Sequence, residues 1–522
     1  MKYLRNQEGG LMGIYLIISL ALLGSVANLQ AQPDRYDLPI QEHIFEYGLR
    51  LLVLEKPGDH RVACKIFTDF GALVETPGDL GSAHFLEHLM FKGTRTLGTT
   101  DWQAERPIIE EIDATEQALI LEMNRARNEL RQRGVFHDYQ HAKSTPALDS
   151  LRRRLAELNE QGQKYRKHGA TMRWYQGYGG AKLTASTEQE YMKFDINLPR
   201  ERAALFLRVE ADRMRNSVFR EFDQERMILV EQRYGDLNRP ATPFYEAMNA
   251  LVSSVHPVFW PEGHLSDFEQ YTRQYHRDLY ERYFIPNNTT LVFIGGVTLE
   301  EMIPLVERYF GWMERQPEPM RVKAIEPLPQ AEKRLVWRSS ILSPRVDVRF
   351  MIPAVGHPDR PHFDVLGEVL DLKIGKALQH KDLNGKVNVN TRVVHTSRFG
   401  VPATFNVEVA DLKESEIAQV EEMILSAVKV EAVDAERLKL AKKRLRTAWY
   451  RTALNPDRLA FEIGHFQIMD SWRSLQPYLE ARERTTSDDL LRLAKRYFIP
   501  ENRSVGVVHP PEQPDQMKGG TQ

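Results

Sequence analysis

The sequence predicts an α+β protein built from two copies of one domain, with a helical insertion in the first copy and a targeting segment in front. A repeated motif carries the prediction of duplication, because Arg-Tyr-Phe-Ile-Pro occurs at residues 282–286 and again at residues 496–500. Each copy of the motif follows a stretch of helical pattern and precedes an apolar, β-prone run, which is typical of a helix-to-strand corner. Five identical residues ending at the proline make coincidence a poor explanation.

The chain is long enough for several domains. It has 522 residues and a mass of 60.5 kDa, and at about 100–200 residues per domain this predicts two to four domains. Lys and Arg total 70 against 72 Asp and Glu, so the formal net charge is −2, and the chain lacks the basic surface of a general nucleic-acid binder. The single cysteine, Cys64, excludes intrachain disulfides and a cysteine-based structural zinc site.

Residues 1–31 have the pattern of a secretory signal peptide. A positively charged start precedes an apolar run over residues 11–27, and small residues follow, so cleavage is expected after Ala27 or Ala31. The apolar run also approaches the length of a membrane span, which leaves an uncleaved inner-membrane anchor as the alternative. We therefore expect an exported, periplasmic protein with no stable membrane span after cleavage.

The domains follow one another along the mature chain. We expect a first domain over residues 35–315, a Pro-rich linker over 316–330, a second domain over 331–510 and a disordered polar tail over 511–522. Inside the first domain, residues from about 105 to 168 are charged, and their leucines recur at helical spacing. This insertion is predicted to be a helical hairpin projecting from the domain.

Each domain is expected to begin with a pair of strands. In the first, residues 49–54 and 62–67 are apolar and flank a Pro-Gly-Asp turn, which is the pattern of a β-hairpin. In the second, residues 335–337 and 346–352 look like the matching strands. A helix that contains a His-Phe pair is predicted after each pair of strands.

The passage after Gly81 carries the candidate chemistry. His84 and His88 lie four residues apart, so on a helix both imidazoles share one face and can take two corners of a tetrahedral zinc site. Glu87 lies beside His88 and is free to act as the general base on a zinc-activated water. Fewer than about 0.07 chance matches to His-x-x-Glu-His are expected in a chain of this composition. The alternative is a core helix whose polar residues bond one another.

His-Phe-Leu-Glu-His, followed by Phe-Lys-Gly-Thr, resembles the inverted zinc motif of the insulinase/pitrilysin (M16) metallopeptidases, in their bacterial single-half form. Gly71, Glu75 and residues 219–226, together with the duplication, carry the same resemblance, which covers most of residues 40–510. It implies two domains that each have a mainly antiparallel sheet packed by helices. It also implies that a peptide is held by strand addition to a sheet edge, and that two such halves enclose a chamber.

The resemblance further implies a third zinc ligand from a later helix. The family commonly has a first Glu and the ligand Glu seven residues on, which from Glu225 gives Gln232, whereas a register starting at Gln224 gives Glu231. Because a neutral amide is a poorer zinc ligand than a carboxylate, chemistry favours Glu231, while the ungapped match favours Gln232. We expect Glu231 as the ligand with Gln232 as the alternative, and Glu225 as a residue that orients a ligand.

Thr184, Ala185 and Ser186 are expected in a strand that borders the site and pairs with substrate backbone; relatives often have Asn where Thr184 stands. The leading hypothesis is an exported endopeptidase with one Zn²⁺ per active site, acting on peptides or unfolded segments. Since one half cannot close a chamber, a homodimer or a pair with a related chain is expected. The alternative is a non-catalytic or weakly active family member that binds peptide or partners an active half.

Overall fold

The structure is a computed structural model, and it describes residues 36–135, 145–253, 263–320, 326–327, 329–381, 383, 389–393 and 403–511. The predicted signal peptide and nearly all of the predicted tail lie outside these residues, as does part of the predicted linker. Residues 1–39 form one unit and residues 40–522 a second. All the helices and strands named below belong to the second unit.

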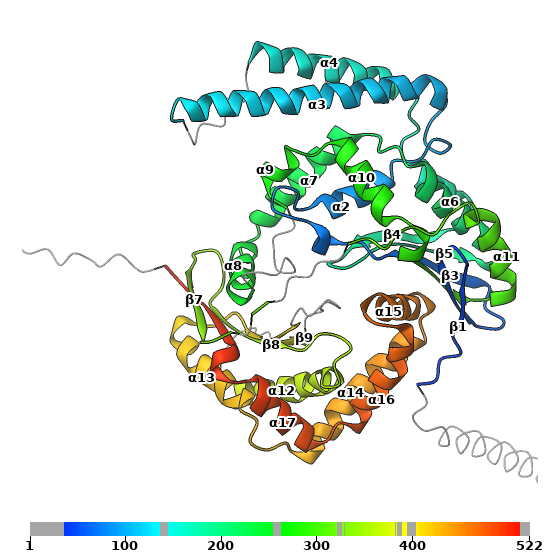
Figure 1. The fold of residues 1–522 in the computed structure, drawn as a ribbon. Coiled ribbons are helices and arrows are strands. Elements are labelled where there is room, and N and C mark those ends of the chain that lie inside the picture. The colour runs from blue at the N-terminus through cyan, green and yellow to red at the C-terminus, as the bar shows by residue number, and fades with distance from the viewer. Residues whose placement is uncertain are drawn as a thin grey trace, which may run out of the picture. The chain divides into compact units, whose positions relative to one another are not determined.

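The first domain is organised around a six-stranded sheet (Figure 1). Its strands are β1 (Gln41–Ile44), β2 (Arg50–Glu55), β3 (Arg61–Thr68), β4 (Ala181–Thr187), β5 (Met192–Pro199) and β6 (Thr289–Gly295). Their order is β1-β2-β6-β3-β5-β4, with β2 and β6 parallel and the other pairs antiparallel.

The expected hairpin between residues 49–54 and 62–67 is wrong. Both segments are strands of this sheet, but β6 lies between them and pairs with each of them, so they do not pair with each other. The Pro-Gly-Asp turn indicates only that the chain reverses direction at that point. It does not indicate whether a distant segment of the chain enters the sheet between the two strands.

The second domain repeats the arrangement. Its strands are β7 (Lys333–Arg338), β8 (Arg345–Ile352), β9 (Val389–Val393), β10 (Ala403–Val409) and β11 (Arg503–His509). The order β7-β11-β8-β10-β9 matches β2-β6-β3-β5-β4, and its parallel pair, β7 with β11, falls at the same place. Two mainly antiparallel sheets of one topology confirm the predicted fold class and the duplication.

The repeated corner has the same structural role in both domains. The Asn288 side chain donates to the carbonyl that ends α10 (Arg273–Tyr283) and to a carbonyl just after β3, at 2.8 and 3.0 Å. Asn502 donates to the carbonyl that ends α17 (Ser487–Tyr497) and to that of Met351 in β8, both at 2.7 Å. The asparagine two residues after each repeated motif therefore ties a helix end to the neighbouring strand.

The helices cover both faces of the sheets. Besides α10 and α17 they are α2 (Ser82–Met90), α3 (Trp102–Gln132), α4 (Pro146–Gln163), α5 (Ala170–Gly177), α6 (Ala203–Asn216), α7 (Phe222–Leu237), α8 (Thr242–Val252), α9 (Leu265–Phe268), α11 (Leu299–Phe310), α12 (Arg360–His380), α13 (Ile417–Val428), α14 (Ala435–Ala453), α15 (Pro456–Met469) and α16 (Leu475–Arg484).

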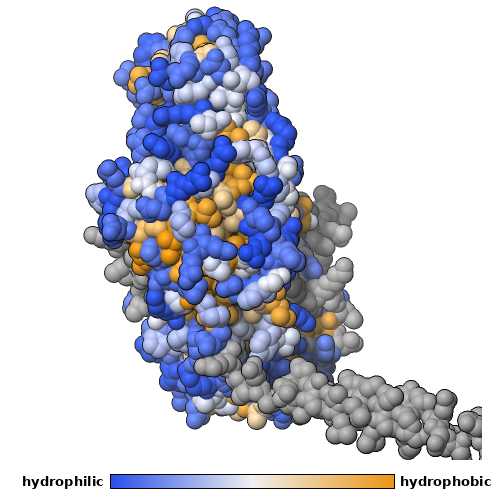
Figure 2. Space-filling model, turned by 90° about the vertical axis from the view of Figure 1, so that its right-hand side faces the viewer, coloured by the Kyte–Doolittle hydropathy of each residue, from blue (hydrophilic) through white to orange (hydrophobic). Residues whose placement is uncertain are grey.

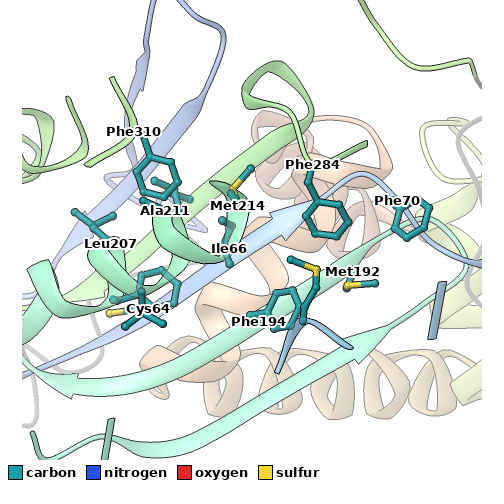
Figure 3. Close-up of a cluster of buried hydrophobic side chains, with 14 of the residues drawn as sticks. Cys64, Ile66, Phe70, Met192, Phe194, Leu207, Ala211, Met214, Phe284 and Phe310 are labelled. Carbon is teal, nitrogen blue, oxygen red and sulfur yellow. The ribbon is translucent and has the colours of Figure 1, made fainter. Parts of the chain in front are cut away.

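Apolar side chains from β3 and β5 pack against α6 and α11 to form the first domain's core (Figure 3). Cys64 lies within it, and burial raises the pKa of its thiol, which disfavours the reactive thiolate form.

Each domain contributes a helix to the other domain's sheet. Helix α15, from the second domain, packs on β3 and β6, and a methyl group added at Gly464 would lie 2.1 Å from the Phe67 ring. Helix α8, from the first domain, packs on β7 and β11, where a methyl group at Gly506 would lie 2.4 Å from the sulfur of Met248. Glycine at these two positions permits the close approach.

Helices α3 and α4 form a helical hairpin whose apolar sides face each other. Ion pairs that include Glu105–Arg220, Asp113–Arg273 and Arg127–Glu269 join α3 to the rest of the domain. The hairpin is therefore attached along much of α3. Its surface, at the top of Figure 2, is mostly hydrophilic, while apolar residues gather in the middle of the same face of the molecule.

Candidate metal and peptide site

Helix α2, which carries the candidate residues, is fixed at its start by Glu75. The helix begins after Gly81, whose φ of 92° lies in the left-handed region and which has no side chain to cap the helix. The Glu75 carboxylate instead accepts from the backbone N–H groups of Gly81 and Ala83, at 2.8 and 2.7 Å. A carboxylate at this end satisfies free N–H groups and the helix dipole. The sequence had offered Glu75 only as part of a resemblance.

The two imidazoles lie next to each other on α2. The ring centroids of His84 and His88 are 4.8 Å apart and the ring planes are nearly perpendicular, at 87°. Nδ1 of His88 lies 3.0 Å from Oε2 of Glu225 on α7, and Oε1 of Glu225 lies 2.6 Å from the Lys92 ammonium. One carboxylate thus links the second imidazole to a cation one turn further along.

The charge on Glu225 determines how His88 is oriented. Burial alone would raise the pKa of Glu225, but the hydrogen bonds from His88 and Lys92 outweigh burial and lower its pKa. Glu225 is therefore a carboxylate at neutral pH and accepts a hydrogen bond from the Nδ1–H group of His88. With Nδ1 engaged by Glu225, Nε2 is the ring nitrogen left to bind a metal ion.

A cleft opens beside these rings. It has a volume of about 280 Å³ and is lined by His84, Glu87 and residues 185–189, which end β4 and turn toward β5. Glu87 is only 8% exposed, and its Oε2 accepts a hydrogen bond of 2.7 Å from the Thr187 hydroxyl. An acid, an imidazole and a strand therefore meet in one cleft.

Strand β4 forms the edge of the sheet at this cleft. Among the described strands it pairs only with β5, so its other side is open. Ala185 and Ser186 line the cleft, whereas the Thr184 hydroxyl donates to Asp195, at 2.9 Å, and does not line it. The register shifts between residues 181 and 184, so a bulge limits the regular edge to Thr184–Thr187.

The third ligand expected from the sequence does not join this group. Within the described ranges, no three His, Cys, Asp or Glu side chains are close enough together to hold a metal ion. Glu231 and Gln232 are both exposed on α7, and Glu231 lies opposite the buried face formed by Phe222, Glu225, Leu229 and Arg233. The arrangement therefore fits two of the three protein ligands of a catalytic zinc site, His84 and His88.

The second domain has the corresponding helix without the chemistry. His362 is the third residue of α12, as His84 is of α2. Val365 and Leu366, both fully buried, stand where the first domain has Glu87 and His88. The pair of imidazoles with an acid beside the second is thus a feature of the first copy and not of its repeat.

Comparisons with known proteins agree with this fold. A family model described as insulinase (peptidase family M16) matches residues 50–131, and one described as the peptidase M16 inactive domain matches residues 270–445. A protein described as an uncharacterized zinc protease, from Rickettsia bellii (strain RML369-C), is 39% identical over 67 residues. That match spans 13% of this chain and only 15% of the relative's length.

Solved structures share the fold across most of the chain. A protease from Helicobacter pylori superposes with a TM-score of 0.71 at 17% identity, covering 91% of this chain and all of the other. A peptidase M16 inactive domain from Pseudomonas fluorescens gives 0.68 at 10% identity, covering 91% and 98%. The periplasmic protease PqqL from Escherichia coli gives 0.66 at 12% identity, covering 91% of this chain and 48% of that one.

A duplicated α+β fold, with a His-x-x-Glu-His helix beside an open strand edge, defines the class as peptidase-like. The chain belongs to the M16 (insulinase) peptidase family. This confirms the resemblance on which the sequence interpretation rested.

Proposed function

We propose that this chain is an exported zinc-dependent endopeptidase that hydrolyses peptides or unfolded segments. The observation that carries the proposal is the cleft in which Glu87 and His84 face the open edge of β4. Such a cleft offers an acid–base group, an imidazole next to a second imidazole and an unpaired strand to one extended peptide.

His84 and His88 would hold the zinc ion, which when bound supplies Lewis-acid polarisation and a lower pKa for water. Glu87 would accept the proton of the attacking water at Oε1, because Oε2 is held by Thr187. Glu225 would orient the His88 ring by accepting a hydrogen bond from Nδ1, which leaves Nε2 to hold the metal ion.

The substrate backbone would pair with β4. An extended peptide can add to an open sheet edge through main-chain hydrogen bonds. These bonds do not depend on the peptide's side chains, so they can form with any segment that adopts an extended conformation. The bulge after Ala181 limits this pairing to the segment Thr184–Thr187, next to Glu87. The proposal therefore favours unfolded segments over folded proteins as substrates.

A quenched-fluorescence peptide assay with added zinc tests the proposal. Glu87→Gln should lower kcat by about 10²–10⁴-fold, the usual contribution of a general base. Glu436→Gln, on an exposed residue of the second domain, serves as the matched control and should leave the rate unchanged. Equal rates in wild type and Glu87→Gln would overturn the proposed mechanism.

The pairing with β4 has its own test. A peptide inhibitor N-methylated at alternate residues cannot form every main-chain hydrogen bond of a strand. One of the two alternating N-methylation patterns should therefore inhibit cleavage much less than the unmodified peptide, while the other should not. If both patterns inhibit as strongly as the parent peptide, strand addition is excluded.

Export and assembly are part of the proposal. No helix in the described residues is both long and apolar enough to cross a bilayer. The pattern of residues 1–31 supports a cleaved signal peptide, and the periplasmic relative of the same fold makes the periplasm the favoured compartment. The mass of the purified mature protein tests cleavage after Ala27 or Ala31. Sedimentation tests the proposed homodimer, or the pairing with a related chain.

The second candidate is a weakly active or non-catalytic peptide-binding subunit. It is favoured by one observation: within the described residues, no group of three His, Cys, Asp or Glu side chains is arranged to hold a metal ion. Under this hypothesis Glu87→Gln would leave peptide affinity unchanged and no cleavage would be measured in either protein.

A further inference from the structure

Helices α2 and α7 contact each other in antiparallel order beside the two imidazoles of α2. Lys92 contacts Glu221, at 3.5 Å, and Glu225, at 2.6 Å, while His88 contacts Glu225, at 3.0 Å. One turn back along α2 thus corresponds to one turn forward along α7. His84 lies one turn before His88, so its counterpart lies one to two turns beyond Glu225.

Only one residue in that position carries a donor atom. At 100° per residue, Ile228, Leu229 and Gln232 lie within about 60° of Glu225 around the helix axis. The first two are apolar, and Gln232 lies only about 20° from Glu225. Glu231 lies about 120° away and is exposed on the side opposite the buried face.

We propose that Gln232 occupies the third protein position of the metal site, so that this chain holds its metal with two imidazoles and a neutral amide. This inference builds on the proposed use of His84 and His88 as ligands. Zinc sites are built from Cys, His and carboxylate donors, whereas amide oxygens suit harder cations. A carboxylate would also offset part of the charge of a divalent ion, and an amide does not. The consequence is a site of weakened zinc affinity that a single substitution repairs.

The experiment compares the zinc affinity of the full mature chain with those of Gln232→Glu and Glu231→Gln, by competition with a chromogenic chelator. Loss of an outer hydrogen-bonding partner already changes metal affinity by about 10–100-fold. We therefore expect Gln232→Glu to bind zinc at least about tenfold more tightly than wild type. Glu231→Gln, the matched change one residue away, should bind zinc as wild type does.

The opposite pattern overturns the inference. If Glu231→Gln loses zinc while Gln232→Glu gains none, Glu231 is the ligand. Gln232→His supplies an imidazole and is also expected to bind zinc more tightly, so it replaces the glutamate variant if that variant fails to fold. If neither Gln232 variant changes the zinc affinity, the proposal is refuted.

The peptide assay, run on the same proteins, separates this inference from the proposed function. Tight zinc binding by Gln232→Glu without cleavage would leave the inference standing and remove the proposed hydrolysis. If the wild type cleaves the peptide and binds zinc as tightly as Gln232→Glu does, the proposed hydrolysis stands and the inference about Gln232 is refuted.

Discussion

His276 should make the stability of the first domain sensitive to mild acid. The residue is fully buried on α10, behind the helix of the candidate site, with the rings of Phe85, Phe222 and Tyr271 around it at centroid distances of 4.9, 5.6 and 4.8 Å. Its Nδ1 lies 2.8 Å from the Thr272 carbonyl, and Nε2 has no hydrogen-bond partner among the described groups. Burial lowers the pKa of His276 from 6.5 to about 4.

The sign and size of the effect follow from linkage. Because the folded-state pKa lies below the unfolded-state value, protonation favours the unfolded chain. The contribution of His276 to stability is complete above pH 6.5 and is lost progressively as the pH falls toward 4. With these two values, the loss between pH 7 and pH 5 is about 2 kcal/mol.

The assay is urea unfolding of the mature chain at pH 7 and pH 5, followed by tryptophan fluorescence, for wild type and for His276→Leu. The leucine variant has its own stability, so the quantity of interest is the difference between the two pH dependences. The wild type should lose about 2 kcal/mol more than the variant over this interval. Parallel pH dependences would refute the reasoning, since they would show that His276 does not titrate differently on unfolding.

Two further predictions concern packing and charge. Glu105→Gln leaves the buried guanidinium of Arg220 without its charge partner and should destabilise the chain by about 3–5 kcal/mol in urea, whereas Glu110→Gln, in an exposed pair on the same helix, should leave the midpoint unmoved. Gly464→Ala drives a methyl group into the ring beneath α15 and should cost about 1–3 kcal/mol. Gly375→Ala, where open space surrounds the new methyl group, should raise the thermal midpoint. A stabilised Gly464→Ala protein would contradict the close packing of α15.

Local patterns in the sequence predicted local structure well. The spacing of His84 and His88 placed both imidazoles on one side of a helix, and the repeated corner gave the duplication. The asparagine that follows each repeated motif bonds its corner in the same way in both domains.

Features that depend on distant segments were not predictable in this way. Strand β6 enters the sheet between β2 and β3, and α15 packs on the first domain's sheet. Both contacts join segments that are far apart in the sequence, and the spacing of residues within a segment does not predict such contacts. The side of α7 on which Glu231 lies was not predictable for a related reason. A carboxylate is a good zinc ligand, which favoured Glu231 as the third ligand. The orientation of α7, however, is set by its buried residues Phe222, Leu229 and Arg233, and Glu231 lies on the opposite, exposed side of the helix.

The exchange of covering helices has a consequence for biosynthesis. The last strand of the first sheet emerges from the ribosome with Gly295, but the helix that covers its second face begins only at Pro456. At about 5–20 residues per second, that delay of roughly 160 residues lasts about 10–30 s. Throughout this time the nascent first half has a sheet face that lacks its covering helix, and this face includes the Phe67 ring and the ion pair of Lys65 and Asp195. A chaperone that covers this face until α15 is made would limit aggregation of the half-made protein.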